Sequence, residues 1–437
     1  SAVRSTIVPA VVGTTSMFAA NLAIRPNVLV AGASYTLTLS CLQSIGGRQV
    51  TVSTSSIDLT MNAPPSAGSL TVTPSHGVAL TDLFTFVARN WVDTELPLTY
   101  KFGFISPSSG ATLQIRGQSV LTYGSSLLPA GSTVSGGNIT IVLSVFDSMS
   151  ANTSTSQRVR VTDSASSVYA FAAPLAAVRN DSEQTRQLIS IYSTAINAVN
   201  CTLAPDCAAL NRESCVAVDH TCGVCLDTYF GDTGNSNAPC FAQSRRLQAT
   251  TCASTAACSF FESCLGGYCI AQNKTCVQDC FGHGQCEFSS HNTGLKVPSC
   301  AVTDFSCSAT CVCDASHFGT ACVRTALAQY NRATARHDLI TAFSDLLVID
   351  YPEADTVTSW ITILSSLVQV PDELSNAAGN DVVTLIQSVI AAAQTQNLPF
   401  ETAMGLTLSI SSIPTSLTPP SASSPAVTKV YYENVMR

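Results

Sequence analysis

Cysteines are the residues of this chain whose types and spacing most readily support chemistry. The sequence holds nineteen, and eighteen of them fall between Cys201 and Cys322. Cysteines can form disulfides, ligate zinc or act as a redox pair, and Cys222-x2-Cys225 has the spacing of half a zinc site or of a redox pair. Its setting, a dense block in a chain without a long charged face, favours a disulfide scaffold made in an oxidising compartment. We therefore expect no metal and no cofactor.

Spacing divides the cysteine block into three groups, each with an even number of members, so each group can close on itself. The groups are Cys201, Cys207, Cys215, Cys222, Cys225 and Cys240, then Cys252, Cys258, Cys264 and Cys269, then Cys276, Cys280, Cys286, Cys300, Cys307, Cys311, Cys313 and Cys322. Spacing alone leaves the pairing from Cys201 to Cys269 open. The remaining Cys41 lies on a predicted strand. We interpret it as a small buried hydrophobic residue, with an intermolecular disulfide as the alternative.

Other catalytic motifs are missing from the sequence. It contains no nucleophile elbow, phosphate-binding loop, His-Glu-x-x-His motif or paired-carboxylate motif, and its six histidines are scattered singly. His283 lies in a Gly-His-Gly turn and His317 in a similar turn, and we interpret both as structural residues rather than ligands. We predict that the protein is not an enzyme.

Composition limits the kinds of partner. The net charge is −8 and no basic run exists, which argues against a nucleic-acid partner. Only 11% of residues are charged, against roughly 25% in a typical soluble domain. The mean hydropathy is +0.28, yet no window approaches the ~18 consecutive apolar residues of a membrane span. Such a surface is expected to carry glycans or to be buried against other protein subunits.

Five Asn-x-Ser/Thr sequons predict N-linked glycans at Asn138, Asn152, Asn180, Asn200 and Asn273. The first residues, Ser1-Ala2-Val3-Arg4, do not read as a signal peptide. We therefore expect a processed or excised part of an extracellular protein, either secreted or held at the cell surface, with no membrane span in this chain.

Period-two patterns predict strands in the first part of the chain. Phe84, Phe86 and Ala88 alternate with residues of the opposite face, and Tyr100 and Phe102 do the same in the next run. The expected fold is a mainly β mosaic. It has an immunoglobulin- or fibronectin-III-like β-sandwich at 63–165, preceded by a partial β-sandwich at 1–62 that a partner's strand could complete.

Helical periodicity begins near residue 180 and returns after Cys322. Asn180 and Glu183 resemble a capping box at the start of a connecting helix within 166–200. Cysteine-rich modules are expected at 201–275 and a further module at 276–323. A helical domain follows at 324–412, with helices over 327–347, 355–367 and 373–396, and then a Pro-rich tail at 413–437. The first of these helices has the apolar stripe Leu327, Tyr330, Ala333, His337, Ile340, Phe343 and Leu347, and the last has Val382, Leu385, Ile386, Val389 and Ile390.

The last group of cysteines resembles an EGF-like module. Cys276-x3-Cys280-Phe-Gly-His-Gly-Gln-Cys286 is similar to its beginning, and Cys311-x-Cys313 followed by Cys322 is similar to its end. The resemblance implies the pairs Cys276–Cys286, Cys280–Cys311 and Cys313–Cys322, with Cys300 and Cys307 as an inserted bridge. Calcium-binding modules of this family carry an acidic motif before the first cysteine, which residues 271–275 lack, so we predict no calcium there.

Three segments resemble the receptor-for-egg-jelly (REJ) type of ectodomain, which also occurs in polycystin-1-like proteins. They are the run from Ile24 to Leu37, the run from Asn62 to Leu80, and Trp91-x-Asp93-x-Glu95-x-Pro97-Leu98-x-Tyr100-x-Phe102. We expect Trp91, Tyr100 and Phe102 to be structural core residues. Asp93 and Glu95 are expected to cap a turn or meet solvent, with carbohydrate or calcium binding as the alternative. Where such domains often hold two cysteines, this chain has Leu70 and Ala88, so both halves of one bridge are missing together.

Two hypotheses for function follow. The first is a non-catalytic extracellular structural or adhesive glycoprotein, a subunit of a surface or flagellar filament that self-associates into a polymer. Low charge and the thin N-terminal segment favour it. The alternative, which rests on the family resemblance, is the ectodomain of a polycystin-like surface receptor that binds glycans or cells.

Overall fold

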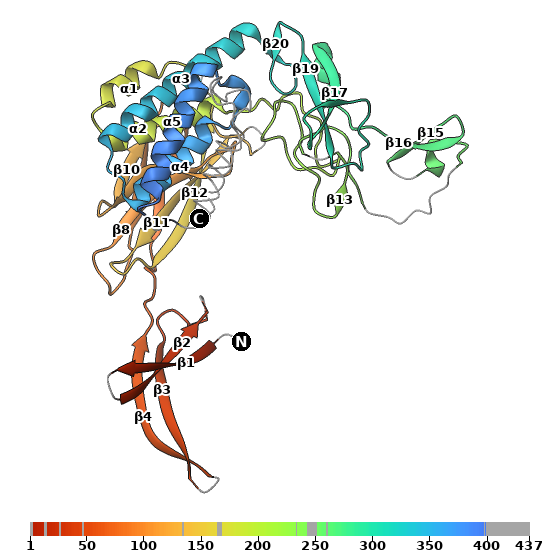
Figure 1. Ribbon diagram of the computed structural model, residues 1–437. Helices are drawn as coiled ribbons and strands as arrows, with labels where there is room; N and C mark the ends of the chain where they lie inside the picture. The colour runs from red at the N-terminus through yellow and green to blue at the C-terminus, as the bar shows by residue number, and fades with distance from the viewer. Residues whose placement is uncertain are drawn as a thin grey trace.

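The structure of the chain is a computed structural model that describes residues 3–12, 15–25, 28–45, 48–132, 135–163, 168–232, 234–242, 251–258, 261–396 and 398. Figure 1 shows its parts: the N-terminal hairpins, the sandwich, a layer of helices on the sandwich, and small modules with short strands to one side. The predicted fold class, a mainly β mosaic with a helical region, is confirmed. The predicted tail at 413–437 lies outside the described residues.

Two long hairpins form the N-terminal part of the chain. β1 (Val3–Val12) pairs with β2 (Thr15–Ile24), and β3 (Ser34–Ile45) pairs with β4 (Arg48–Thr60), both antiparallel. Within the described residues, neither hairpin is joined to a third strand. Every residue from 53 to 60 is exposed. Because an isolated two-stranded sheet is at best marginally stable in water, this part of the chain needs a covering surface more than any other.

The sandwich consists of a three-stranded and a five-stranded sheet. The three-stranded sheet has the order β10 (Tyr123–Ser126), β7 (Phe84–Arg89), β5 (Ser69–Thr73). The five-stranded sheet has the order β6 (His76–Val78), β12 (Asn152–Thr162), β11 (Asn138–Phe146), β8 (Thr99–Ile105), β9 (Thr112–Ser119). Only the contact of β6 with β12 is parallel within these two sheets. Strict alternation buries one face of each inner strand: in β11, Ile139, Ile141, Leu143 and Val145 are buried.

Helix α2 (Ser182–Ile196) joins the sandwich to a second hydrophobic core. Its Ile191 packs into the sandwich core, whereas Ile189 and Ile196 pack among other helices. An apolar residue on each of two faces is typical of a helix buried between layers. The helix therefore fixes the sandwich and the helical layer to each other.

The N-terminus of α2 is shifted by one residue from the predicted capping box. Asp181, not Asn180, is the N-cap, and its carboxylate accepts a hydrogen bond from the backbone N–H of Gln184 at 2.9 Å. The prediction of an Asn180 cap is wrong because the adjacent carboxylate is a comparably strong capping group already in place. Glu183 instead accepts a hydrogen bond from the backbone N–H of Gly117 in β9 at 2.9 Å.

The helical body contains helices from both sides of the cysteine block. α1 (Ala172–Val178) and α2 precede the block, and α3 (Ala326–Ile349), α4 (Ala354–Leu367), the short turn η3 (Pro371–Glu373) and α5 (Asn376–Ala393) follow it. All of these α-helices contribute to one core, in which Phe343 and Trp360 are buried. The disulfide modules are thus inserted between two halves of one helical body, an arrangement that local periodicity does not reveal.

Helix α3 turns a different face inward than the sequence predicts. Leu327 and Tyr330, assigned to its apolar stripe, are 70% and 68% exposed. The buried positions are Ala335, Arg336, Leu339, Ile340, Phe343 and Leu346. The stripe is wrong in its first half because the inward face there carries arginines that meet a buried acid, described below. By contrast, the stripe of α5 is confirmed at Val382, Leu385, Ile386 and Val389.

Short elements make up the disulfide modules between α2 and α3. They are β13 (Tyr229–Phe230), β14 (Phe241–Ala242), η1 (Thr255–Ala257), β15 (Glu262–Leu265), β16 (Tyr268–Ala271), η2 (Val277–Gly282), β17 (Gly284–Ser290), β18 (Lys296–Val297), β19 (Cys307–Cys313), β20 (His317–Phe318) and β21 (Arg324–Thr325). We call residues 201–242 module 1, 251–272 module 2 and 273–325 module 3. None of the helices that the structure describes is long and apolar enough to cross a lipid bilayer.

Candidate functional site

Nine disulfides close within the three groups of cysteines. The bonds are Cys201–Cys215, Cys207–Cys222, Cys225–Cys240, Cys252–Cys264, Cys258–Cys269, Cys276–Cys286, Cys280–Cys311, Cys300–Cys307 and Cys313–Cys322. Both members of Cys222-x2-Cys225 are bonded to more distant cysteines, so neither is a thiolate that could hold zinc. The four bonds of module 3 are those that the EGF resemblance implies, whereas its identity as an EGF-like module stays a prediction.

Cys41 is exposed, so its interpretation as a buried hydrophobic residue is wrong. It lies on β3 opposite Ser53 of β4, at an irregularity in the register of the hairpin. Its cross-strand neighbour Ser53 is exposed as well, so the side chain of Cys41 meets solvent. An intermolecular disulfide, the alternative reading, stays a prediction.

Trp91 packs against the sandwich core without being enclosed in it, so the expectation that it is a core residue holds only in part. Tyr100 and Phe102 are buried in the core, but Trp91 is only partly buried. Asn90 has a positive φ of 58°, so the chain turns out of β7 just before the indole. The ring covers Gly68 instead, where an added Cβ would lie 2.0 Å from it. The indole of Trp91 therefore covers the backbone at Gly68.

Asp93 holds the turn between β7 and β8 together. Its Oδ1 accepts hydrogen bonds from the backbone N–H groups of Glu95 at 3.1 Å and Thr94 at 2.7 Å. The bond from the Glu95 amide is the largest cause that lowers the pKa of the Asp93 carboxyl below its ordinary value. Glu95 accepts a hydrogen bond from the Thr94 hydroxyl. Both carboxylates thus accept hydrogen bonds from residues of their own turn, and the role of this turn is structural.

All five sequon asparagines are exposed, as glycosylation requires: Asn138, Asn152, Asn180, Asn200 and Asn273. Asn138 and Asn152 begin the adjacent strands β11 and β12. Asn180 and Asn200 flank α2 at its two ends. Glycans at these positions stay a prediction.

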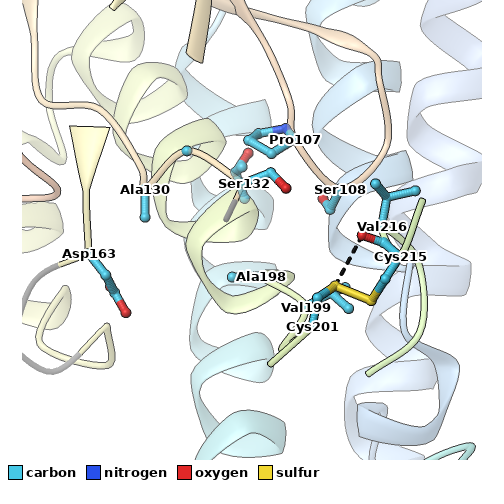
Figure 2. Close-up of a pocket in the computed structure, with 12 residues that line it drawn as sticks. Pro107, Ser108, Ala130, Ser132, Asp163, Ala198, Val199, Cys201, Cys215 and Val216 are labelled. Carbon is cyan, nitrogen blue, oxygen red and sulfur yellow. Dashed lines mark hydrogen bonds between the residues drawn. A yellow bond between two sulfur atoms is a disulfide. The ribbon is translucent and has the colours of Figure 1, made fainter. Parts of the chain in front are cut away.

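Two cavities lie where the modules meet the rest of the chain. Figure 2 shows the smaller one, about 120 Å³ in volume, with the Cys201–Cys215 disulfide, Val199 and Val216 close together in its wall. This volume is well below the ~300–1,000 Å³ of ordinary ligand pockets. The larger cavity has a volume of about 420 Å³, which falls within that range.

The larger cavity, which we call the junction cavity, is lined by both polar and apolar residues. It lies between the C-terminal end of α2, module 1, the last residues of module 3 before α3, the first turns of α3, and η3. Its lining residues include both hydrogen-bond donors and acceptors, among them Asp219, Asn235, Arg324, Arg332, Gln369 and Asp372. Apolar residues such as Val199, Val218 and Val370 complete the lining, which suits a ligand that has both polar groups and apolar faces, as a sugar does.

A buried acid, Glu373, organises the wall of the junction cavity. Its Oε1 accepts hydrogen bonds from Arg324 Nη1 at 2.6 Å and Arg332 Nε at 2.5 Å. Its Oε2 accepts from Arg336 Nη2 at 2.6 Å and Nε at 3.1 Å. Glu373 and Arg336 are both fully buried. Because the three arginines come from β21 and α3 and the acid from η3, the cluster ties module 3 to the helical body.

The positive charges of the arginines lower the pKa of the Glu373 carboxyl. Burial by itself would raise the pKa of Glu373, but Arg336 and Arg332 outweigh it and hold that pKa below its ordinary value. Burial lowers the pKa of Arg336, and Glu373 counteracts that effect. Arg336 also donates to Leu367 O at 2.7 Å and to Asn197 Oδ1 at 2.8 Å. Each charge is thus paired or hydrogen-bonded, as a buried ion must be.

Sequence reasoning missed this cluster. Arg332 and Arg336 stand four residues apart, which places them on one helical face, and they do so in a chain with few charges. That spacing alone would have indicated a polar stretch on α3. Nothing local indicates that Glu373, from the turn after α4, is the partner.

A β-sandwich capped by helices and joined to disulfide modules defines the molecule as an extracellular mosaic. Residues 9–193 match the family model of the REJ domain. Residues 9–193 are therefore a REJ, polycystin-1-like region, which runs from within β1 through the second hairpin, the sandwich and α1 to most of α2. REJ domains are a non-catalytic extracellular family, and the nine disulfides fit a secreted or surface location.

The two positions where REJ domains often have cysteines are paired in this fold. Leu70 of β5 lies directly opposite Ala88 of β7 in the antiparallel register. Residues opposite each other in such a pair have their Cβ atoms about 4.5–5.5 Å apart. Leucine and alanine thus occupy a cross-strand site, and Ala88 is buried there.

Proposed function

We propose that this chain is a recognition region of a polycystin-like surface protein and that it binds a glycan. The observation that carries the proposal is the REJ match over residues 9–193, since REJ domains are extracellular and non-catalytic. The disulfides and the exposed sequons support the same setting. On this view the scaffold presents a binding surface, and no chemical step takes place on it.

The junction cavity, whose lining residues at 197–372 follow the matched segment, is where we expect the glycan to bind. Sugar hydroxyls both donate and accept hydrogen bonds, and the cavity offers Asp219, Asn235 and Asp372 together with two guanidinium groups. Both guanidinium groups already pair with Glu373, and Asp219 and Asp372 add negative charge, so a neutral sugar bound through its hydroxyls is the preferred ligand. The disulfide Cys207–Cys222 and the Glu373 cluster hold the two walls, so little ordering accompanies binding.

Binding of the full chain to an array of neutral and acidic glycans tests this proposal. Asp372 and Asn235 are exposed and line the cavity, so Asp372→Ala and Asn235→Ala are expected to weaken binding about tenfold each while leaving the fold intact. Glu353→Ala, an exposed acid outside the cavity, is the matched control. The proposal fails if the unchanged chain retains no glycan, or if all three variants bind as it does.

Self-association through the N-terminal hairpins is a second candidate. The filament-subunit hypothesis gains nothing from the REJ match, but the β3–β4 hairpin exposes apolar side chains beside its free edges. Leu39, Ile57 and Leu59 are 54%, 65% and 39% exposed. A strand from a second copy of this chain would complete the sheet and cover them.

Cys41 gives this candidate a direct readout. If two β3–β4 hairpins pair, concentrated protein under mild oxidation is expected to yield a disulfide-linked dimer on a non-reducing gel. Cys41→Ser should abolish that band but keep the concentration-dependent association in analytical ultracentrifugation, since the strands make the contact. A wild-type chain that sediments as a monomer at every concentration would remove this candidate and leave the glycan proposal untouched.

A further inference from the structure

Module 3 brings together three metal-ligating side chains, one of which, His283, is about thirty residues from the other two in the sequence. His283 follows η2, Asp314 follows β19, and His317 begins β20. One ligand atom from each lies within 4.8 Å of the others. The three side chains are accessible, at 47%, 45% and 21% exposure respectively. None of them lines the junction cavity or lies in the N-terminal hairpins.

Disulfides and backbone hydrogen bonds fix the segments that carry these residues. Cys280–Cys311 and Cys313–Cys322 flank them. The backbone N–H of Asp314 donates to His283 O at 2.8 Å, which locks the two segments together. Gly284 permits the close approach, because a Cβ there would lie 2.6 Å from Val312 O. The site is therefore built on rigid segments, as a ligand-binding site requires.

The side chains already interact with one another. The imidazole rings of His283 and His317 stack with centroids 3.7 Å apart and planes 15° apart. Asp314 Oδ1 lies 2.9 Å from His317 Nδ1, and its Oδ2 lies 3.9 Å from His283 Nδ1. Ser316 donates to the same Oδ1 through its hydroxyl at 2.7 Å and its backbone N–H at 2.9 Å. These bonds orient the carboxylate toward the Nδ1 atoms at the edges of the two stacked rings.

Hydrogen bonding keeps the carboxylate ionised. The Ser316 hydroxyl, followed by His317, holds the pKa of Asp314 far below its usual range. Neutral imidazole nitrogen and ionised carboxylate oxygen are the forms that bind metal.

We propose that His283, Asp314 and His317 form a binding site for a divalent transition-metal ion, with Zn²⁺ as the ion of choice. Two imidazole nitrogens and one carboxylate oxygen suit Zn²⁺, and a fourth position remains for water. The nitrogen lone pairs lie in the ring planes, so the stacked rings must rotate apart to point at one ion. Their exposure permits that rotation. The ion then cross-links the start of β17 to the turn after β19 and stabilises module 3.

Isothermal titration of the untagged full chain, stripped of metal by a chelator, with Zn²⁺ alone tests the site. We expect one strong site per chain. His283→Ala and His317→Ala should each weaken it more than about tenfold, and so should Asp314→Asn, which keeps the shape of the turn. His291→Ala changes an exposed histidine of the same module outside the cluster and should leave the affinity unchanged.

X-ray absorption at the zinc edge supplies a second readout that does not depend on the variants. Two imidazole ligands and additional oxygen ligands are expected, with no sulfur ligand. The proposal is overturned if the chain binds no Zn²⁺, if His291→Ala weakens binding as much as His317→Ala does, or if the spectrum shows sulfur ligation. Circular dichroism of each variant confirms that the chain is folded before titration.

Discussion

Replacing Glu373 with alanine is expected to lower the free energy of unfolding of the helical body by about 3–5 kcal/mol, because it leaves buried charge unpaired. Arg336 is fully buried, and the side chains of Arg324 and Arg332 are only 15% and 17% exposed. These guanidinium groups share Glu373 as counter-ion. Without it they repel one another at a place that water reaches poorly.

Denaturation followed by tryptophan fluorescence measures this effect. Trp360 is buried in the helical core, so the Trp91→Phe background makes it the sole fluorescent reporter. Glu353→Ala removes an exposed glutamate near the start of α4 and is expected to stay within about 0.5 kcal/mol of the parent. A Glu373→Ala variant as stable as that control would show that the arginines find other partners.

The same cluster makes stability depend on pH. The pKa of Glu373 in the folded chain lies below its ordinary value because the arginines outweigh burial. A carboxyl with a lowered folded-state pKa contributes stability above its unfolded pKa of about 4.3, and that contribution is lost as the pH falls through the folded-state value. Glu373→Gln should be less stable at neutral pH and should lose less of its stability on acidification. Parallel pH profiles for the two proteins would contradict this account.

Local patterns predict the sandwich and the helices well because each strand or helix has its own periodicity. In β11, alternate residues from Ile139 to Val145 are buried because a strand has only two faces. The α5 stripe from Val382 to Val389 follows in the same way from the helical repeat. The α3 stripe fails at Leu327 because a helix with apolar residues on several faces does not indicate which face a neighbour covers.

Pairings between distant segments are what the sequence could not supply. Counting cysteines in even groups predicts that each group closes on itself, but the Glu373 cluster joins residues 37 to 49 positions apart. The helical body likewise closes across the whole cysteine block, and Asn197 before the block contacts Arg336 after it. His283 and His317 read as isolated turn residues because only the disulfide framework brings their rings together. Such contacts depend on topology, not on the residues nearby.

Cys41 and Trp91 show the opposite error, in which a residue type suggested more burial than the fold provides. Both are apolar residues on or beside strands, where burial is the usual outcome. Cys41 is exposed on a hairpin that no third strand extends among the described residues. Trp91 is only partly buried because the chain has already left β7 at Asn90. Burial of a single residue thus depends on how many layers the fold places over it.

Removal of the Cys280–Cys311 bond is expected to destabilise module 3 more than removal of Cys300–Cys307. The first bond spans 31 residues and the second spans 7. Closing these loops in the unfolded chain accounts for about 3.7 and about 2.4 kcal/mol respectively in the chain-entropy description. Module 3 has little apolar surface of its own, so the cross-links carry most of its stability.

Hydrogen exchange in β17 and β19 measures the difference, since these strands form the sheet of module 3. The variants are the double changes Cys280→Ala with Cys311→Ala, and Cys300→Ala with Cys307→Ala, so neither leaves a free thiol. If amide hydrogens exchange only when the module opens, exchange should accelerate several hundred-fold in the first variant and roughly fifty-fold in the second. Peptides from β11 in the sandwich serve as the internal control and should not change. Equal acceleration by the two variants would mean that loop length does not govern the effect, and that strain or structure in the unfolded module does instead.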